Sequence, residues 1–171
     1  MKRLVVRSFF ILILVLLGAM WIYALFFASK EVVNEITDRS WTNRAEAICS
    51  AAAQERVALA DFTPLNQAGA NALVERAKLV DLATDTLDRM LIQLEATTPT
   101  DAKGQALIPL WIIDYRTYIV DRRSYANQLR AGTDVPFGET IVMGIPLSEK
   151  LSTFAADNFM TSCKPPMDLS I

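Results

Sequence analysis

An apolar run near the N-terminus constrains this chain more than any other feature. From Phe9 to Ala28, 20 residues follow one another without a charged or strongly polar side chain. An α-helix rises about 1.5 Å per residue, so a helix of this run spans roughly 30 Å, the thickness of a bilayer core. We therefore predict a transmembrane helix over residues 8–28.

A cleaved secretory signal peptide is the alternative interpretation of the same run. The apolar part of a signal peptide usually has about 7–15 residues and ends at a small-x-small motif. This run is longer, and bulky Phe26 lies two positions before Ala28. The tripeptide at residues 22–24 is a slightly better cleavage site but still a poor one. The length therefore favours an uncleaved signal-anchor helix.

The charges on either side of the run predict its orientation. Three basic residues lie within residues 1–7, whereas Lys30 is followed closely by acidic residues. An excess of Lys and Arg marks the cytoplasmic side of a membrane helix. We expect a cytoplasmic N-terminus over residues 1–7, a membrane-proximal helical stalk over 29–40 and an extracytoplasmic domain over 41–171. A cytoplasmic end this short cannot hold a catalytic domain.

The exterior residues have the pattern of amphipathic helices separated by proline and glycine. Apolar residues recur at spacings of three and four in four stretches, which is the period of a helix with one buried face. They are Trp41, Ala45, Ile48 and Ala52; Leu73, Ala77, Val80, Ala83, Leu87, Met90, Leu91 and Leu94; Ile108, Trp111, Tyr115, Tyr118, Tyr125 and Leu129; and Leu147, Leu151, Phe154, Ala155 and Phe159. The predicted fold is all-α: a transmembrane helix, then an extracytoplasmic antiparallel bundle of three long helices and one short helix.

Capping and breaking residues predict the limits of the third long helix. Thr100 or Asp101 can cap its start, and Gly132 stands where a left-handed residue ends a helix. Pro109 lies inside this helix and is expected to kink or restart it. Residues 133–146 contain further glycines and prolines, and we predict a long packed loop with one short extended piece.

The two cysteines are predicted to form a disulfide bond. Cys49 lies midway along the first exterior helix and Cys163 follows the fourth. Two cysteines in an oxidising exterior compartment usually pair. Closing a loop of this length stabilises a fold by roughly 4–5 kcal/mol on the chain-entropy model. A redox site is the alternative, but no Cys-x-x-Cys motif or histidine is present to lower a thiol pKa.

The composition argues against several kinds of chemistry. The chain has no histidine, which excludes histidine-dependent triads and histidine-ligated zinc, haem and di-iron centres. Its 17 basic and 19 acidic residues give a formal net charge of −2, which offers no basic surface for nucleic acid. No phosphate-binding loop or nucleophile elbow is present. We expect a protein that is not an enzyme and has no cofactor, metal site or nucleic-acid partner.

Three aspartates share one face of the second exterior helix. Asp81, Asp85 and Asp88 are spaced by four and three residues, with Arg89 beside them. Such a cluster can be a cation site or a solvated, ion-paired helix face, and the absence of a turning loop favours the latter. Residues 61–72 begin like a calcium loop but lack its glycine and its final glutamate, so we do not predict one there.

An arginine occupies an inward position of the third long helix. Arg122 lies one turn from both Tyr118 and Tyr125. A buried guanidinium must stack on aromatic rings or pair with a carboxylate, for which the three aspartates of the neighbouring helix are candidates. The alternative is a pocket for an anionic ligand that also includes Trp111 and Tyr115. Aromatic residues at helical spacing are usually core, which favours the internal pair.

The C-terminal region resembles a group of bacterial envelope proteins. The residues are Ile145-Pro-Leu-Ser, Phe154-Ala-Ala-Asp-Asn158 and Cys163-Lys-Pro-Pro. They are similar to the ending of small membrane-anchored proteins of high-GC Gram-positive bacteria, which have one N-terminal span, a helical exterior domain and two cysteines. The resemblance implies a disulfide and a location in the bacterial envelope, and it implies no activity.

These features lead to two principal functional hypotheses. The first is a non-catalytic, single-pass membrane-anchored envelope protein whose helical bundle is an interaction module of a membrane assembly, with a protein partner. The second is a module that binds a small ligand through the aromatic and arginine pocket. A sensor acting through a partner and an exterior hydrolase are weaker alternatives, because the chain has neither a second span nor a catalytic motif.

Overall fold

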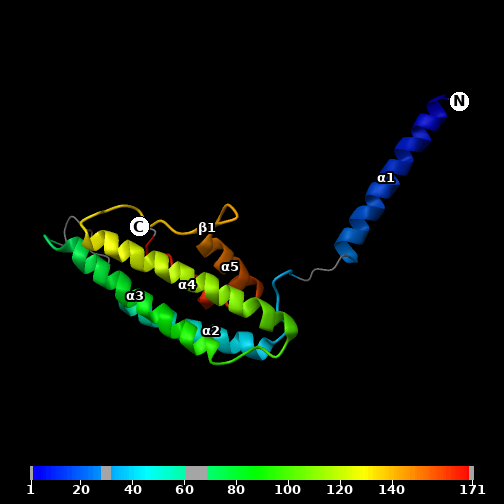
Figure 1. Cartoon of the computed structure of the whole chain (residues 1–171). Helices are drawn as coiled ribbons and strands as arrows, with labels where there is room; N and C mark the ends of the chain where they lie inside the picture. The colour runs from blue at the N-terminus through cyan, green and yellow to red at the C-terminus, as the bar shows by residue number, and fades with distance from the viewer. Residues whose placement is uncertain (1, 28–31, 61–68, 170–171) are drawn as a thin grey trace. The chain divides into compact units, whose positions relative to one another are not determined.

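The computed structural model describes residues 2–27, 32–60 and 69–169. Within them the chain forms five α-helices, one pair of short strands and a 3₁₀ turn (Figure 1). The chain divides into two units, Met1–Val33 and Asn34–Ile171. We call the second unit the body and describe the two separately.

The first unit contains one helix, α1, from Lys2 to Phe26. Its segment Val6–Phe26 is long and apolar enough to cross a membrane, and none of this segment is buried within the protein. A membrane span and a signal sequence both fit this description. The helix therefore agrees with the predicted apolar helix over residues 8–26; Phe27 is a turn residue, and residue 28 lies outside the described residues.

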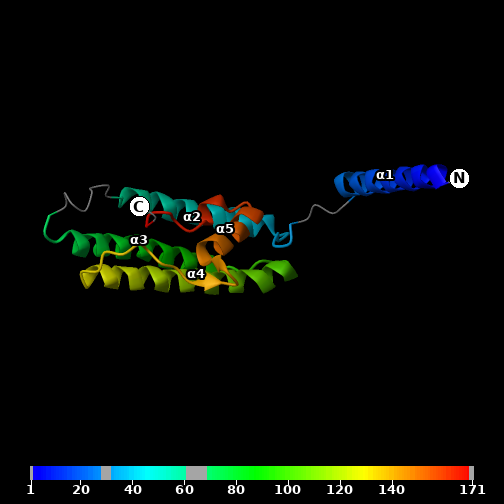
Figure 2. The same cartoon turned by 90° about the horizontal axis from the view of Figure 1, so that it is seen from above.

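The body is a helical bundle, as predicted. Its helices are α2 (Arg39–Ala58), α3 (Ala72–Glu95), α4 (Ala102–Arg130) and α5 (Leu147–Asp157), followed by the 3₁₀ turn η2 (Thr161–Cys163). The helices α3 and α4 lie antiparallel along their lengths, and α2 packs on α3 (Figures 1 and 2). The shorter α5 packs on α4, and η2 packs on α2 and α5.

The core of the body lies where the predicted apolar faces meet. Its largest fully buried aromatic and aliphatic side chains are Trp41, Tyr115, Tyr118, Ile36, Leu87, Met90, Leu91, Leu94, Leu129, Leu147 and Leu151. The Trp41 indole also donates a 2.8 Å hydrogen bond to the carbonyl of Thr97. This bond fastens the start of α2 to the connection between α3 and α4.

One predicted core position is wrong. Phe159 is 67% exposed, because α5 ends at Asp157 and the chain turns through a left-handed residue, Phe159, with φ 60°. The amide of Met160 donates to the Ala155 carbonyl at 2.8 Å, and that of Phe159 donates to Ala156 at 3.1 Å. This is a Schellman C-cap, which sends Met160 into the core instead of Phe159.

The predicted helical stalk over residues 29–40 is also wrong over residues 32–38. Residues 32–38 form turns and non-helical backbone, and α2 begins at Arg39. Asp38 caps this helix, and Ile36 is fully buried with its amide donating to the side chain of Asn158 at 2.8 Å. These tertiary contacts fix a chain path that a continuous helix would not allow.

The expectations for α4 are partly confirmed. Asp101 caps its start by accepting a 2.8 Å hydrogen bond from the amide of Gly104, and Gly132 adopts a φ of 81° after its end. The predicted restart at Pro109 does not occur, because α4 is continuous. Buried residues on both sides of the proline, including Ile108 and Trp111, hold the two halves against the core.

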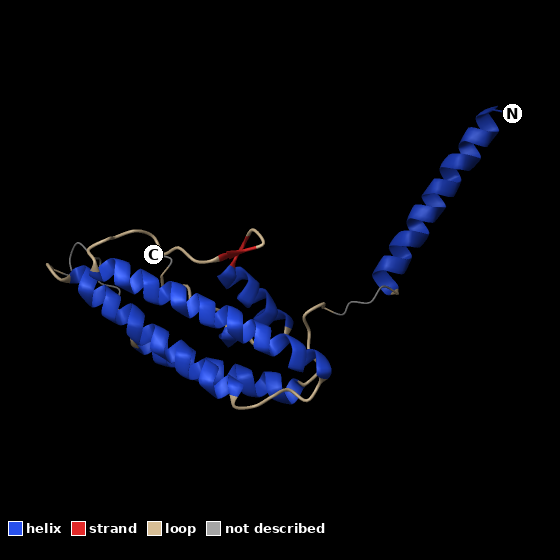
Figure 3. Cartoon of the chain, viewed as in Figure 1, coloured by secondary structure: helices blue, strands red, loops and turns tan. Residues whose placement is uncertain are grey.

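Residues 133–146 contain the predicted extended piece as a small hairpin (Figure 3). Strands β1 (Ile141–Val142) and β2 (Ile145–Pro146) pair antiparallel, so the fold is not purely helical. Met143 and Gly144 form the turn, with φ values of 53° and 83°. Positive φ at both positions is typical of the type I′ turn, whose twist matches that of the strands.

The Asp38 cap makes a testable prediction of pH dependence. Hydrogen bonds from the amide of Thr100, then from that of Trp41 and the hydroxyl of Thr100, lower the pKa of Asp38 to about 2. A lowered pKa stabilises the folded state above the ordinary value near 3.8, and this stabilisation is lost as pH falls toward 2. We expect Asp38→Asn to lower the unfolding midpoint at neutral pH.

The difference between wild type and Asp38→Asn should shrink as the pH falls from about 4 to 2. Thermal unfolding followed by circular dichroism across this range measures it, and Glu55→Gln, at an exposed ion pair with Arg89, is the control. A difference for Asp38→Asn that is the same at pH 2 and pH 7 would contradict the prediction.

Candidate functional site

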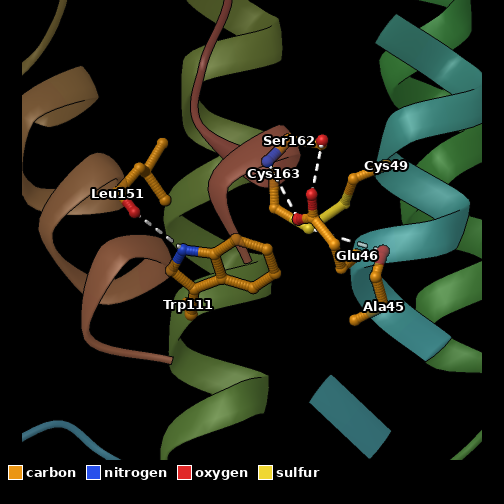
Figure 4. Close-up of a disulfide and its surroundings, with 7 residues drawn as sticks. All are labelled: Ala45, Glu46, Cys49, Trp111, Leu151, Ser162 and Cys163. Carbon is orange, nitrogen blue, oxygen red and sulfur yellow. Dashed lines mark hydrogen bonds between the residues drawn. A yellow bond between two sulfur atoms is a disulfide. The ribbon is translucent and has the colours of Figure 1, made fainter. Parts of the chain in front are cut away.

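The predicted disulfide bond between Cys49 and Cys163 is confirmed. It joins α2 to η2, both cysteines are fully buried, and their Cα atoms are 4.9 Å apart (Figure 4). The described residues contain no free cysteine. A buried disulfide is shielded from thiols and reductants in solution, which supports the structural interpretation over a redox site.

Polar contacts reinforce the attachment of η2 to α2 beside the disulfide. The Glu46 carboxylate accepts hydrogen bonds from the amide and hydroxyl of Ser162, at 2.9 and 2.6 Å (Figure 4). The Cys163 sulfur lies 3.5 Å from the Ala45 carbonyl oxygen, a contact without a donated hydrogen because the sulfur is bonded to Cys49. The C-terminal segment is thus held to α2 by covalent and polar bonds together.

The aromatic residues predicted as a pocket form a packed seam along α4. Trp111 lies edge-on to Tyr115, with ring centroids 5.3 Å apart, and Tyr115 lies edge-on to Tyr118 at 6.2 Å. The Trp111 indole donates to the carbonyl of Leu151 at 3.3 Å (Figure 4). Tyr125 is only half-buried. The three buried rings therefore fill space between the helices with one another.

Arg122 lies at the end of this seam and is fully buried. Its guanidinium binds both carboxylate oxygens of Asp168, at 2.6 and 2.8 Å, and donates to the Thr84 hydroxyl at 2.9 Å. Burial alone lowers the pKa of Arg122, but the hydrogen bonds and charge of Asp168 outweigh burial and raise it. An internal carboxylate partner was expected, but on α3; the partner instead comes from the C-terminal segment.

Two further buried polar groups lie near Arg122: Arg56, which the sequence reasoning missed, and the hydroxyl of Tyr115, a residue of the predicted pocket. Arg56 is 9% exposed and donates to the Thr86 hydroxyl at 3.1 Å, and its burial lowers its pKa. The Tyr115 hydroxyl is buried without a hydrogen-bond partner among the described residues, and burial raises its pKa. The spacing of Arg56 four residues after Ala52 extends the buried face of α2, and this signal was available in the sequence.

The aspartates of α3 form an ion-pair network with two arginines of α4, since Arg130 pairs with Asp81 in addition to Arg123. Arg123 contacts Asp81 at 2.9 Å, Asp85 at 2.5 Å and Asp88 at 2.9 Å. Arg89 instead pairs with Glu55 of α2. In the part of the chain that the structure describes, no group of three or more acidic or cysteine side chains is arranged to hold a metal ion. The rejected calcium loop at residues 61–72 lies mostly outside that part.

An open apolar groove lies at the α3–α4 connection and was not predicted. It has a volume of about 250 Å³. Its lining includes Leu94, Pro99, Ile108, Pro109, Ile112 and Ile113. The Glu95–Arg116 ion pair, 2.5 Å long, lies at its edge. We call this feature the apolar groove.

No protein-family model, curated protein or solved structure matches this chain. The function must therefore be argued from the residues and the geometry described above.

Proposed function

We propose that this chain is a non-catalytic, single-pass membrane-anchored envelope protein. The observation that carries the proposal is α1, whose Val6–Phe26 segment exposes apolar side chains along its length and buries none of them in the protein. A soluble protein rarely leaves so large an apolar surface uncovered, and a bilayer is the solvent that such a helix needs. The basic residues before α1 favour a cytoplasmic N-terminus.

The buried disulfide supports an extracytoplasmic location for the body. Disulfides persist in oxidising compartments and are rare in the reducing cytoplasm. The Cys49–Cys163 bond joins segments 114 residues apart, so it belongs to the architecture of the body and not to a local loop. The orientation from the charges and the location from the disulfide agree with each other.

The outer face of α3 and α4 supports a role in protein interaction. Ile92 and Val120 are 62% and 63% exposed, and they share these faces with the acidic residues of α3 and with Arg116 and Arg123 of α4. We propose that a protein partner in a membrane assembly contacts this face. On such a surface, apolar side chains contribute affinity for a partner, and the surrounding charges fix the orientation in which the partner binds.

Membrane fractionation of the full chain tests the anchor. After expression in a bacterium, we expect the protein to remain in the membrane pellet through alkaline washing, with an intact mass that includes residues 1–28. Its cysteines should react with a maleimide only after a reductant and a denaturant are added. A mature protein that begins after Ala28, or thiols that react before reduction, would overturn the proposal.

Site-specific photo-cross-linking tests the interaction role. A photoreactive residue at Ile92 or Val120 is expected to give the same discrete adduct in membranes, because both lie on the proposed face. Val57, which is 75% exposed near the end of α2, is the control and should give none. Uncross-linked protein at both test positions would argue against a partner on this face.

Ligand binding at the aromatic seam is a second candidate function. The observation that favours it is a cluster around one carboxylate, Asp168: two buried guanidiniums and the Tyr115 hydroxyl, which has no hydrogen-bond partner among the described residues. Any anionic ligand would have to displace Asp168 from Arg122. Titration of the full chain with acetate or inorganic phosphate, followed by Trp111 fluorescence, tests this candidate, and the absence of a saturable change would exclude these two anions.

A further inference from the structure

One end of the body gathers exposed apolar groups that its own core does not use. It is the end at which the chain enters the body at Asn34, and the connection between α3 and α4 lies there too (Figures 1 and 2). Asp38 joins these parts, because its carboxylate accepts hydrogen bonds from the amide and hydroxyl of Thr100, both at 2.8 Å. We call this region the entry end of the body.

Phe159 is the first of these groups, and neither packing in the core nor the left-handed turn requires a phenylalanine at this position. Its ring is 67% exposed, and its φ of 60° lies in the left-handed region. A Schellman cap usually has glycine or asparagine at this position, and a bulky residue there is strained. Strain that the core does not require is found most often at functional sites.

Arg39 and Phe159 together form a pair of side chains with one cationic and one apolar group. Its guanidinium carbon lies 4.6 Å from the centroid of the Phe159 ring, and it also forms an ion pair with Glu35. A long cationic side chain with an exposed aromatic ring is suited to the boundary between lipid headgroups and acyl chains. Because Glu35 balances the charge of Arg39, the pair does not depend on anionic lipid.

The apolar groove is the second unused feature at this end. It is lined by residues of the connection that Asp38 binds, and exposed Ile113 extends its apolar surface. Leu110, on the same helix, is also 59% exposed. An apolar surface of this kind normally has an occupant.

The length of the chain identifies that occupant. Seven peptide units join Phe27, at the end of the proposed membrane helix, to Asn34, whose side chain donates to Asp157 at 3.0 Å. Even fully extended, seven residues span at most about 25 Å. If α1 is in a bilayer, the entry end is therefore held close to the bilayer surface whatever the orientation of the body.

We propose that the entry end rests on the bilayer, with Phe159 and the apolar groove in contact with the interfacial layer of phospholipid. This inference depends on the membrane anchoring proposed above. It gives the body a fixed orientation on the membrane. The entry end faces the lipid, and the opposite end, with Gly132 and the last turn of α2, faces away from it.

Lipid-quenching measurements on the full chain test this orientation. Single cysteines introduced by Phe159→Cys, Ile113→Cys or Val57→Cys are labelled with an environment-sensitive fluorophore, while the buried native disulfide stays oxidised. Val57 is the matched control, because it is exposed and apolar but lies about 27 Å along α2 from Arg39. Each protein is reconstituted into phosphatidylcholine nanodiscs with or without phosphatidylcholine that has a nitroxide near its headgroup.

We expect quenching at positions 159 and 113 to be several-fold stronger than at position 57. Equal quenching at all three positions, or quenching at position 57 alone, would overturn the inference while leaving the anchor intact. A chain that does not enter nanodiscs at all would instead overturn the proposed anchoring.

Phe159→Gly provides an independent check that does not rely on a label at position 159. Glycine fits the left-handed turn, so the unfolding midpoint should stay the same or rise. Quenching at position 113 should nevertheless fall by a factor of two or more, because the ring no longer holds the entry end at the interface. Unchanged quenching at position 113 would contradict the role of Phe159.

Discussion

Replacing Cys49 and Cys163 together by alanine is expected to lower the free energy of unfolding of the body by about 4–5 kcal/mol. The disulfide closes a loop between residues 114 positions apart, and a cross-link restricts the unfolded chain more as its loop grows longer. Both residues are buried, so the missing sulfur atoms add a small packing cost. Denaturant unfolding of the full chain in mild detergent, followed by circular dichroism, measures the change.

Reduction of the wild-type protein is the control for this experiment. If the disulfide acts mainly by restricting the unfolded chain, the free energy of unfolding of reduced wild type should match that of the double variant within about 1 kcal/mol. The two proteins share all the other contacts of η2. A loss below about 1 kcal/mol in the double variant would show that Glu46 and the core hold the C-terminal segment without the covalent bond.

Removing the carboxylate that faces Arg122 is expected to have the next largest effect. In Asp168→Ala the fully buried guanidinium keeps Thr84 but loses both carboxylate oxygens. Breaking a fully buried ion pair typically costs about 3–5 kcal/mol. The side chain of Asp168 is 36% exposed, so we expect a smaller loss of about 2 kcal/mol. The same unfolding measurement applies.

A double-mutant cycle separates the cost of an unpaired charge from the value of the pair. Arg122→Met with Asp168→Ala removes the buried charge together with its partner, and we expect the double variant to be more stable than Asp168→Ala alone. Arg123→Met removes the arginine of α4 from the more exposed ion-pair network with α3. It is the matched control, and it should lower the free energy of unfolding less than Asp168→Ala does. If the double variant is no more stable than Asp168→Ala, the buried guanidinium of Arg122 does not destabilise the fold when its carboxylate partner is missing.

The positions of the helices followed from the sequence because their causes are local. Helical spacing of apolar residues gave the buried faces of α3 and α4, and the N-cap Asp101 and the left-handed Gly132 marked the limits of α4. The disulfide could be predicted because only one pair of cysteines is present. The helix limits depend on residues close together in the sequence, and the disulfide needed no choice between alternative pairs.

The predictions were wrong where contacts between residues far apart in the sequence determine the backbone conformation or the partner of a side chain. The stalk is not helical because Asp38 bonds to Thr100, 62 residues away, and Ile36 bonds to Asn158, 122 residues away. The partner of Arg122 was expected among the three aspartates of the neighbouring helix, but the path of the C-terminal segment brings Asp168 to it instead. The apolar groove is formed where the end of α3, the connection and α4 come together in space, which no spacing of residues encodes.

The place of Cys163 in the chain has a consequence for biogenesis. It comes after every α-helix of the body that the structure describes. If the body is exported as we propose, the cross-link to Cys49 can close only once these helices have left the translocation channel. On that proposal, disulfide formation is a late step of maturation, and a chain stalled before it carries two thiols and a C-terminal segment without its covalent bond to α2.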